Sequence, residues 1–297
     1  MRILIVGASG LIGSHILWEA KARYHHVLGT YRNFEVKGLK RLDLGDESST
    51  NALVTLFQPD WVVYSAGYTS ADACENNVEQ AFRENCQQPA MLAQLCYDKR
   101  CRFVYVSTTY VFDGNAGPYT EDSKPNPINI YGKSKWAAEQ RIQQIFSGTA
   151  LIPRVICVWG KEGQQKNFVY QTIRALREFR TLRIPSDQIG NPTWAGDIAG
   201  WLLSLMEHEQ SAVWNLAGSE ETLTREDWFC KIRDFARSRL LVPQTTNSGY
   251  IAIPTVDLKQ PALRPLHAGV SIAKIMSFER RSVRLAAELS PILERTK

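Results

Sequence analysis

Short apolar runs alternate with segments of helical periodicity over the first half of the chain. Ile3–Val6 is short enough for a buried strand, and apolar residues then recur every three or four positions from Leu11 to about Arg23, as on one helix face. This alternation predicts an α/β fold with a doubly wound parallel sheet and helices on both faces. Strands are expected at Ile3–Val6, His26–Tyr31, Trp61–Ser65, Phe103–Ser107 and Ala150–Val158, and helices at Leu11–Arg23, Val78–Tyr97 and Tyr131–Gln144.

The pattern loosens after about Gly160. Helices are expected at Asn167–Phe179, Asp197–Met206 and Arg225–Ala236, and a strand at Val213–Leu216, but the segments between them are rich in turns and proline. We therefore predict two parts. Residues 1–160, with about 195–240 returning to them, form the main domain, and about 161–194 together with 241–297 form a smaller, mainly C-terminal lobe.

Composition and charge agree with a globular protein. Of the 297 residues, 44% are hydrophobic and 22% charged, and the net charge of +5 comes without a lysine or arginine block, so nucleic acid is not expected as a partner. Arginines recur every three residues from Arg174 to Arg183. Such a stripe could meet phosphates, but a solvated helix flank is the commoner explanation.

The cysteines and the N-terminus indicate a cytoplasmic protein. The six cysteines show no C-x-x-C spacing and no companion histidines, which favours reduced thiols and argues against zinc or another structural metal. Glycines interrupt the apolar N-terminus before it could serve as a cleavable signal, and no apolar run reaches transmembrane length. No membrane association is expected.

A glycine-rich turn follows the first strand directly. Gly7, Gly10 and Gly13 stand between this strand and the first helix, with the spacing G-x-x-G-x-x-G. In that context the glycines allow a tight turn, a close approach of phosphates, and close packing of helix on strand. The helix N-terminus then stabilises a pyrophosphate. This predicts a Rossmann-type dinucleotide-binding domain, whose first contacts come from Gly7, Ser9, Gly10, Leu11, Ile12 and Gly13.

The end of the second strand bears on the choice of cofactor. An acidic residue there would bond the ribose hydroxyls of NAD, whereas the chain has Arg32, which suits the 2′-phosphate of NADPH. Glu35 lies close enough to keep NADH as an alternative. Asp43 could accept a bond from the adenine amino group or could simply cap the next turn. The expected cofactor contacts are completed by Leu44, Ala66 and Gly67.

A tyrosine and a lysine are four residues apart on the helix predicted from Tyr131. Tyr131 and Lys135 therefore share one helical face. Reduction of a carbonyl by hydride needs a proton donor at oxygen, and a neighbouring ammonium would lower the phenol pKa from near 10 towards neutrality. A hydroxyl from Ser107 or Thr108 would orient the carbonyl. The order of glycine loop, hydroxyl and Tyr-x-x-x-Lys predicts nicotinamide-dependent redox chemistry.

These residues resemble the extended short-chain dehydrogenase/reductase superfamily, and within it the dTDP-4-dehydrorhamnose reductase family. The resemblance spans nearly the whole chain and is most specific at Tyr110–Gly114 and Asp187–Thr193. It implies NADPH-dependent reduction of the 4-keto group of a nucleotide-linked 6-deoxy-4-ketohexose, without a metal for hydride transfer, and is compatible with a homodimer. It also implies that Tyr131 donates the proton, that Lys135 assists and also binds cofactor, and that Thr108 binds the substrate oxygen, with further substrate contacts from Thr69, Tyr110, Cys157 and Asn167.

Two positions depart from the family pattern. Thr109 stands where the family usually has aspartate, and Cys157 where it usually has a tryptophan that faces the sugar, so the identity of the sugar is open. Two other functions remain as alternatives. One is a sugar-nucleotide 4-epimerase or dehydratase, although Thr109-Tyr110 lacks the acid/base pair expected of a dehydratase. The other is a non-catalytic NADP-binding regulatory subunit, resembling the methionine adenosyltransferase β subunit.

Overall fold

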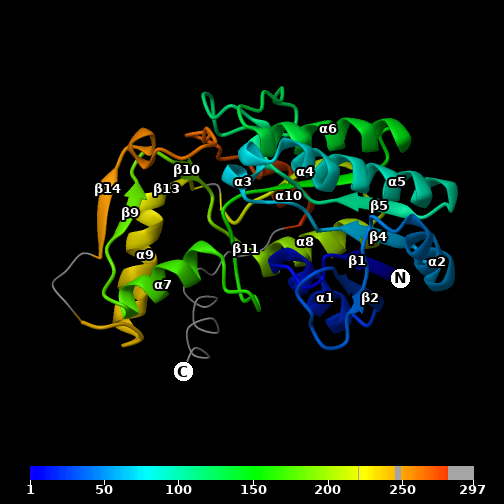
Figure 1. The fold of residues 1–297 in the computed structure, drawn as a ribbon, viewed down its shortest axis with the longest axis horizontal. Helices are drawn as coiled ribbons and strands as arrows, with labels where there is room; N and C mark the ends of the chain where they lie inside the picture. Colours follow the sequence, from blue (N-terminus) through cyan, green and yellow to red (C-terminus); the bar gives the residue numbers. More distant parts are fainter. Residues whose placement is uncertain (220, 245–248, 280–297) are drawn as a thin grey trace.

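A parallel sheet with helices on both faces forms the larger part of the molecule (Figure 1). The computed structural model describes residues 1–219, 221–244 and 249–279. Each strand pair in this sheet is parallel, in the order β12-β7-β5-β4-β1-β2-β3, with β6 also paired to β7. The predicted Rossmann-type fold is confirmed. The strands are β1 (Arg2–Val6), β2 (His26–Tyr31), β3 (Lys40–Arg41), β4 (Trp61–Tyr64), β5 (Arg102–Tyr105), β6 (Ser107–Thr108), β7 (Leu151–Val155) and β12 (Ala212–Leu216).

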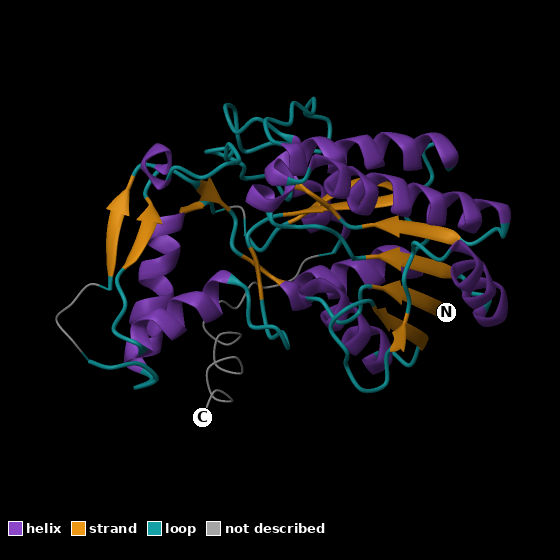
Figure 2. Cartoon of the chain, viewed as in Figure 1, coloured by secondary structure: helices purple, strands orange, loops and turns teal. Residues whose placement is uncertain are grey.

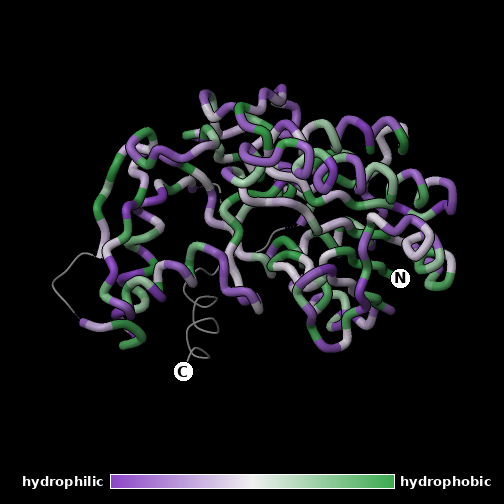
Figure 3. The backbone as a smooth tube through the Cα atoms, viewed as in Figure 1, coloured by the Kyte–Doolittle hydropathy of each residue, from purple (hydrophilic) through white to green (hydrophobic). Residues whose placement is uncertain are grey.

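Two hydrophobic cores lie on opposite faces of the sheet because adjacent strand residues point to opposite sides. Ile3 and Ile5 contribute to the core under α1 and α8, while Leu4 and Val6 contribute to the core under α2, α5 and α6. Apolar and polar residues recur along most of the helices around the sheet (Figure 3), whereas α8 is buried over nearly its whole length. Their bounds are α1 (Leu11–Ala22), α2 (Glu47–Phe57), α3 (Ala71–Asn76), α4 (Val78–Phe82), α5 (Gln88–Asp98), α6 (Ile130–Ile145), α8 (Ala195–Glu207) and α10 (Ala273–Phe278).

The helix predicted over Val78–Tyr97 is interrupted. A π-helical turn, η1 (Arg83–Gln87), separates α4 from α5. A π turn inserts an extra residue per turn and often marks a functional site. Here it brings Glu84 and Asn85 into the protein interior.

A smaller lobe has its own core around Trp228 and Phe229 (Figure 2). Helices α7 (Phe168–Arg177) and α9 (Arg225–Ser238) pack together there, and β9 (Leu182–Pro185) pairs in parallel with β14 (Tyr250–Ile253). Short strand pairs lie between the two parts. They are β8 (Val158–Trp159) with β11 (Thr193–Trp194) and β10 (Ile189–Gly190) with β13 (Leu223–Thr224); the short helices are η2 (Thr109–Val111) and η3 (Thr255–Leu258).

Some segments pack differently from the prediction. Of residues 195–240, α8 and β12 do lie with the main sheet, but α9 packs in the smaller lobe because its apolar face buries Trp228, Phe229 and Ile232 against α7. Of residues 241–297, Val270 and Ile275 join the main core instead of the lobe. Residues 245–248 and 280–297 of that predicted lobe lie outside the described residues.

The predicted helical stripe of arginines is wrong. Helix α7 ends at Arg177, so only Arg174 and Arg177 share it. Arg180 pairs with Glu178, and Arg183 lies in β9, where its guanidinium donates to the carbonyl of Asp257. Within the described part of the chain, no helix combines the length and the apolar character needed to cross a bilayer.

Candidate active site

A cavity of about 950 Å³ lies at the carboxyl edge of the sheet and extends to the smaller lobe. Strand β1 is flanked by β4 and β2, so successive connections leave the sheet in opposite directions on either side of β1. Ligands of doubly wound sheets bind at such a switch point. The lining joins residues of the glycine loop, the ends of β4 and β6, and α9 of the lobe.

The glycine loop forms one wall of the cavity. Gly7 has φ +86°, and a Cβ placed there would lie 2.8 Å from the backbone nitrogen of Ala66. Gly10 is the N-cap of α1 and provides no side-chain cap, so the first amides of this helix point towards the cavity without a side-chain partner. Gly7, Ser9, Gly10, Leu11 and Ile12 line the cavity, together with Leu44, Ala66 and Gly67. Gly13 does not; a Cβ there would meet Ser65 and Ala8.

The end of β2 carries an ion pair. The Nη2 of Arg32 lies 2.9 Å from Oε2 of Glu84, which comes from η1, and both residues line the cavity. The hydrogen bond to Glu84 raises the pKa of the Arg32 guanidinium. Asp43 is not part of the lining; its Oδ1 accepts a hydrogen bond from the Gly45 amide at 3.0 Å, so the turn-capping explanation fits it better than adenine binding.

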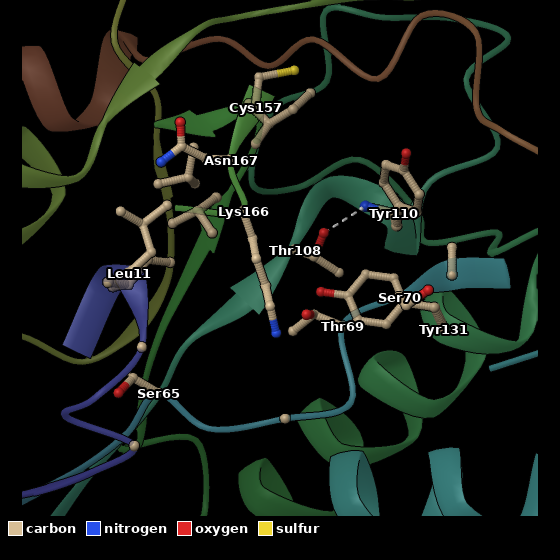
Figure 4. A pocket seen from close by; sticks show the side chains of 18 of the residues that line it. Leu11, Ser65, Thr69, Ser70, Thr108, Tyr110, Tyr131, Cys157, Lys166 and Asn167 are labelled. Carbon is tan, nitrogen blue, oxygen red and sulfur yellow. Dashed lines mark hydrogen bonds between the residues drawn. The ribbon is translucent and has the colours of Figure 1, made fainter. Parts of the chain in front are cut away.

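Tyr131 and Thr108 lie side by side in the lining of the cavity (Figure 4). Asn129 caps α6 by accepting a bond from the Gly132 amide at 2.8 Å, which sets Tyr131 in the first turn. The Thr108 Oγ1 accepts a bond from the Tyr110 amide at 3.2 Å. Burial raises the Tyr131 pKa above its usual value, and the hydrogen bond with Thr108 opposes this rise. The predicted fall in the Tyr131 pKa is therefore wrong for the protein alone.

Lys135 lies beneath the cavity instead of lining it. Its Nζ donates to the Val106 carbonyl at 2.7 Å and lies 3.9 Å from the centroid of the Tyr105 ring. Burial lowers the pKa of Lys135 to about 7, against the opposing effect of the Glu139 charge. Lys135 is not among the causes that shift the Tyr131 pKa, which burial therefore raises.

The four predicted substrate residues all line the cavity, but the polar side-chain atoms of one of them are already hydrogen-bonded within the protein. Thr69, Tyr110 and Cys157 line the cavity, and Cys157 has φ +46°, in the left-handed region (Figure 4). Asn167 also lines it, but its Nδ2 donates to the Gly160 carbonyl at 2.8 Å and its Oδ1 caps α7. Its side-chain polar atoms are thus engaged within the protein.

Several basic residues of the cavity were missed by the sequence reasoning. Arg225 starts α9, and its guanidinium lies 4.7 Å from the Phe168 ring centroid. Arg264 lines the cavity and pairs with Asp72 at 2.7 Å. Lys166 extends into the cavity (Figure 4). Single cations, at a helix start or in a loop, carry no periodic signal that could have marked them beforehand.

Comparison with known proteins identifies similar sequences and similar structures along nearly the whole chain. The model of the RmlD substrate binding domain matches residues 1–292. A dTDP-4-dehydrorhamnose reductase of Aggregatibacter actinomycetemcomitans is 30% identical over 283 residues, 92% of each chain. The methionine adenosyltransferase 2 subunit beta of Xenopus laevis is 30% identical over 78% of this chain and 71% of its own. A dTDP-4-dehydrorhamnose reductase of Bacillus anthracis, solved in complex with NADP, has the same fold, with a TM-score of 0.85, 24% identity and 99% coverage of both chains.

Proposed function

The chain belongs to the RmlD substrate binding domain family of extended short-chain dehydrogenase/reductases, and we propose that it reduces the 4-keto group of a nucleotide-linked 6-deoxy-4-ketohexose with NADPH. One observation carries this proposal. One cavity is lined by the glycine loop, by Tyr131 and Thr108, and by Arg225 of the smaller lobe together with Arg264. The glycine loop would bind the cofactor, Tyr131 and Thr108 would contact the reacting carbonyl, and the arginines would bind the substrate anion.

The residues present fit a dinucleotide. A side chain at Gly7 would collide with Ala66, and one at Gly10 would lie 3.3 Å from the Gly7 carbonyl, so backbone leaves room for a pyrophosphate at the α1 N-terminus. Arg32 would bind the 2′-phosphate, and Leu44, Ala66 and Gly67 would contact the adenosine. NADPH supplies a hydride to the substrate carbon when bound.

Tyr131 would donate the proton to the developing alkoxide. Its raised pKa keeps the phenol protonated at neutral pH, which is the form that a donor needs. Thr108 already accepts a bond from the Tyr110 amide, so its own hydroxyl hydrogen can be directed to the substrate oxygen. Lys135 lies beneath the cavity, and because its pKa is about 7, its Nζ would take up or release a proton near neutral pH.

Arg225 and Arg264 would hold the nucleotide diphosphate. Arg264 is oriented by Asp72 and Arg225 by the Phe168 ring, and both line the cavity. Guanidinium groups bind phosphates in a bidentate manner. Cys157, Thr69 and Tyr110 would then surround the hexose.

The test is NADPH oxidation by the purified protein, followed by absorbance. Substrates are dTDP-4-keto-6-deoxy-L-mannose and, for comparison, the dTDP- and UDP-linked 4-keto-6-deoxyglucoses. Turnover with any of them supports the reductase, and the preferred one identifies the sugar. Tyr131→Phe should lower kcat by about 100-fold or more while NADPH binding is kept. Unchanged turnover in this variant would remove Tyr131 as proton donor.

A regulatory role is the second candidate, favoured by the likeness to the methionine adenosyltransferase 2 subunit beta. A protein that only binds NADP would not need Thr108 and Tyr131 to line the cavity with Lys135 directly beneath it. NADPH binding without turnover on all three sugars would shift the assignment to this role.

A further inference from the structure

The ion pair between Arg32 and Glu84 places opposite charges at the end of the cavity where the cofactor ribose would bind. Arg32 directly follows β2 in the sequence. Glu84 lies on η1, which comes after β4 in the sequence. In dinucleotide-binding sheets an acidic side chain at this place bonds the ribose hydroxyls of NAD, while an arginine accepts the 2′-phosphate of NADP. This chain presents both groups.

Glu84 is held firmly in place. Its side chain is 7% exposed, although it lines the cavity. Oε1 accepts a bond from Gln80 Nε2 at 2.9 Å and Oε2 from Arg32 at 2.9 Å, while its main-chain carbonyl accepts from the Tyr64 hydroxyl at 2.8 Å. A buried carboxylate with these partners is held in one orientation and cannot turn away from an incoming ligand.

Arg32 keeps binding capacity in spite of this pair. Its side chain is 40% exposed, and only Nη2 has a hydrogen-bond partner among the described residues, so Nε and Nη1 can still bind an anion. A second carboxylate, that of Asp43, also acts on the Arg32 charge from a distance. A 2′-phosphate at this place would therefore meet the Arg32 guanidinium and the Glu84 carboxylate.

We propose that Glu84 is a cofactor-specificity residue, whose carboxylate accepts a bond from the ribose 2′-hydroxyl of NADH and repels the 2′-phosphate of NADPH, so that the protein uses both cofactors. Arg32 alone would favour NADPH strongly. With Glu84 in contact with Arg32, part of that preference is lost and NADH gains a polar partner. The assignment rests on the proposed reductase function only in that the cavity binds a nicotinamide dinucleotide.

The experiment is a fluorescence titration of NADPH and NADH into the purified full-length protein without sugar. The wild type should bind the two cofactors with Kd values within about tenfold of each other. In Glu84→Gln, NADPH should bind about tenfold more tightly and NADH about threefold more weakly, as expected for one charge and one charge-assisted hydrogen bond. Glu79→Gln is the matched control, since Glu79 lies on the preceding helix α4 and is 91% exposed, and it should change neither Kd.

Glu84 could instead serve only to orient Arg32. In that case Glu84→Gln, which keeps an acceptor oxygen, would leave both Kd values unchanged or weaken NADPH binding, and either result overturns the proposal. Should this variant fail to fold, as seen by circular dichroism, Arg32→Gln decides. The Glu84 carboxylate then remains without its cation, so NADPH should bind at least about tenfold more weakly than NADH, whereas equal Kd values for the two cofactors would overturn the proposal. Because no sugar is present, these results do not depend on whether the reductase assay succeeds.

Discussion

A buried network behind the candidate active site gives the sharpest prediction on stability. Arg154 on β7 and Glu139 on α6 are 2% and 1% exposed, and Arg154 Nη2 lies 2.7 Å from Glu139 Oε2. Arg154 Nε also donates to the same carboxylate, and the Ser107 hydroxyl donates to its Oε1. The network thus ties β7 and α6 to β6, the strand that carries Thr108. We consider the substitution Arg154→Met, which keeps much of the side-chain volume and removes the charge.

The expected cost follows from what is left behind. Without Arg154, the Glu139 carboxylate keeps a single hydroxyl donor in a site closed to water, and breaking a buried pair in this way costs about 3–5 kcal/mol. The double substitution Arg154→Met with Glu139→Leu removes the stranded charge and should recover at least half of the loss. Arg180→Met is the control, because the Arg180–Glu178 pair is 53% and 52% exposed and should be worth less than about 1 kcal/mol.

The assay is urea unfolding at neutral pH, followed by circular dichroism, for the wild type and the three variants. A loss below about 1 kcal/mol for Arg154→Met would refute the reasoning, since it would mean that water or another donor reaches the Glu139 carboxylate. A double variant as unstable as the single one would refute it equally. The loss would then come from packing of the guanidinium on the neighbouring Phe112 ring instead of from the stranded charge.

Two further predictions concern Lys135 and Cys157. Burial lowers the Lys135 pKa from 10.5 to about 7, so between these values the unfolded chain holds a proton that the folded protein has released. The free energy of unfolding should therefore rise with pH over this window, by up to about 1.4 kcal/mol per pH unit, and Lys135→Met should remove that part of the slope in urea unfolding from pH 7 to 10. An identical slope in both proteins would show that Lys135 is not desolvated. Cys157→Trp should change the ratio of kcat/KM for two 4-keto-6-deoxyhexoses by about tenfold or more, because the side chain lines the cavity. Equal kinetics across the sugars would separate Cys157 from the hexose.

Local features of the fold could be predicted from the sequence because their causes are local. Four-residue apolar runs and helical periodicity located β1, β2, α1 and α6 to within a residue or two. The glycine spacing marked the turn after β1, since Gly7 has a backbone conformation and a close neighbour that a larger residue would not tolerate. Tyr131 and Lys135 were found because a four-residue spacing places two side chains on one helix face.

What the tertiary structure decided is how distant segments meet. Periodicity showed that α9 has an apolar face, but not that α7 covers it in the smaller lobe. Burial also reversed the expected lowering of the Tyr131 pKa. Lys135 lies under the sheet edge, where its Nζ contacts the Val106 carbonyl and the Tyr105 ring, and the Tyr131 pKa stays raised. Desolvation depends on everything packed around a group and has no signature in its neighbours along the chain.

The cofactor end of the cavity shows the same division most clearly. Arg32 could be predicted as a cofactor residue from its place after the second strand, because a cation there suits a nucleotide phosphate. Glu84 is 52 residues further along, and only the π turn of η1 and the parallel pairing of β4 with β1 carry it to the same spot. Charges interact through space, so the combination of positive and negative charge at this site depends on the folded structure and not on neighbouring positions in the sequence.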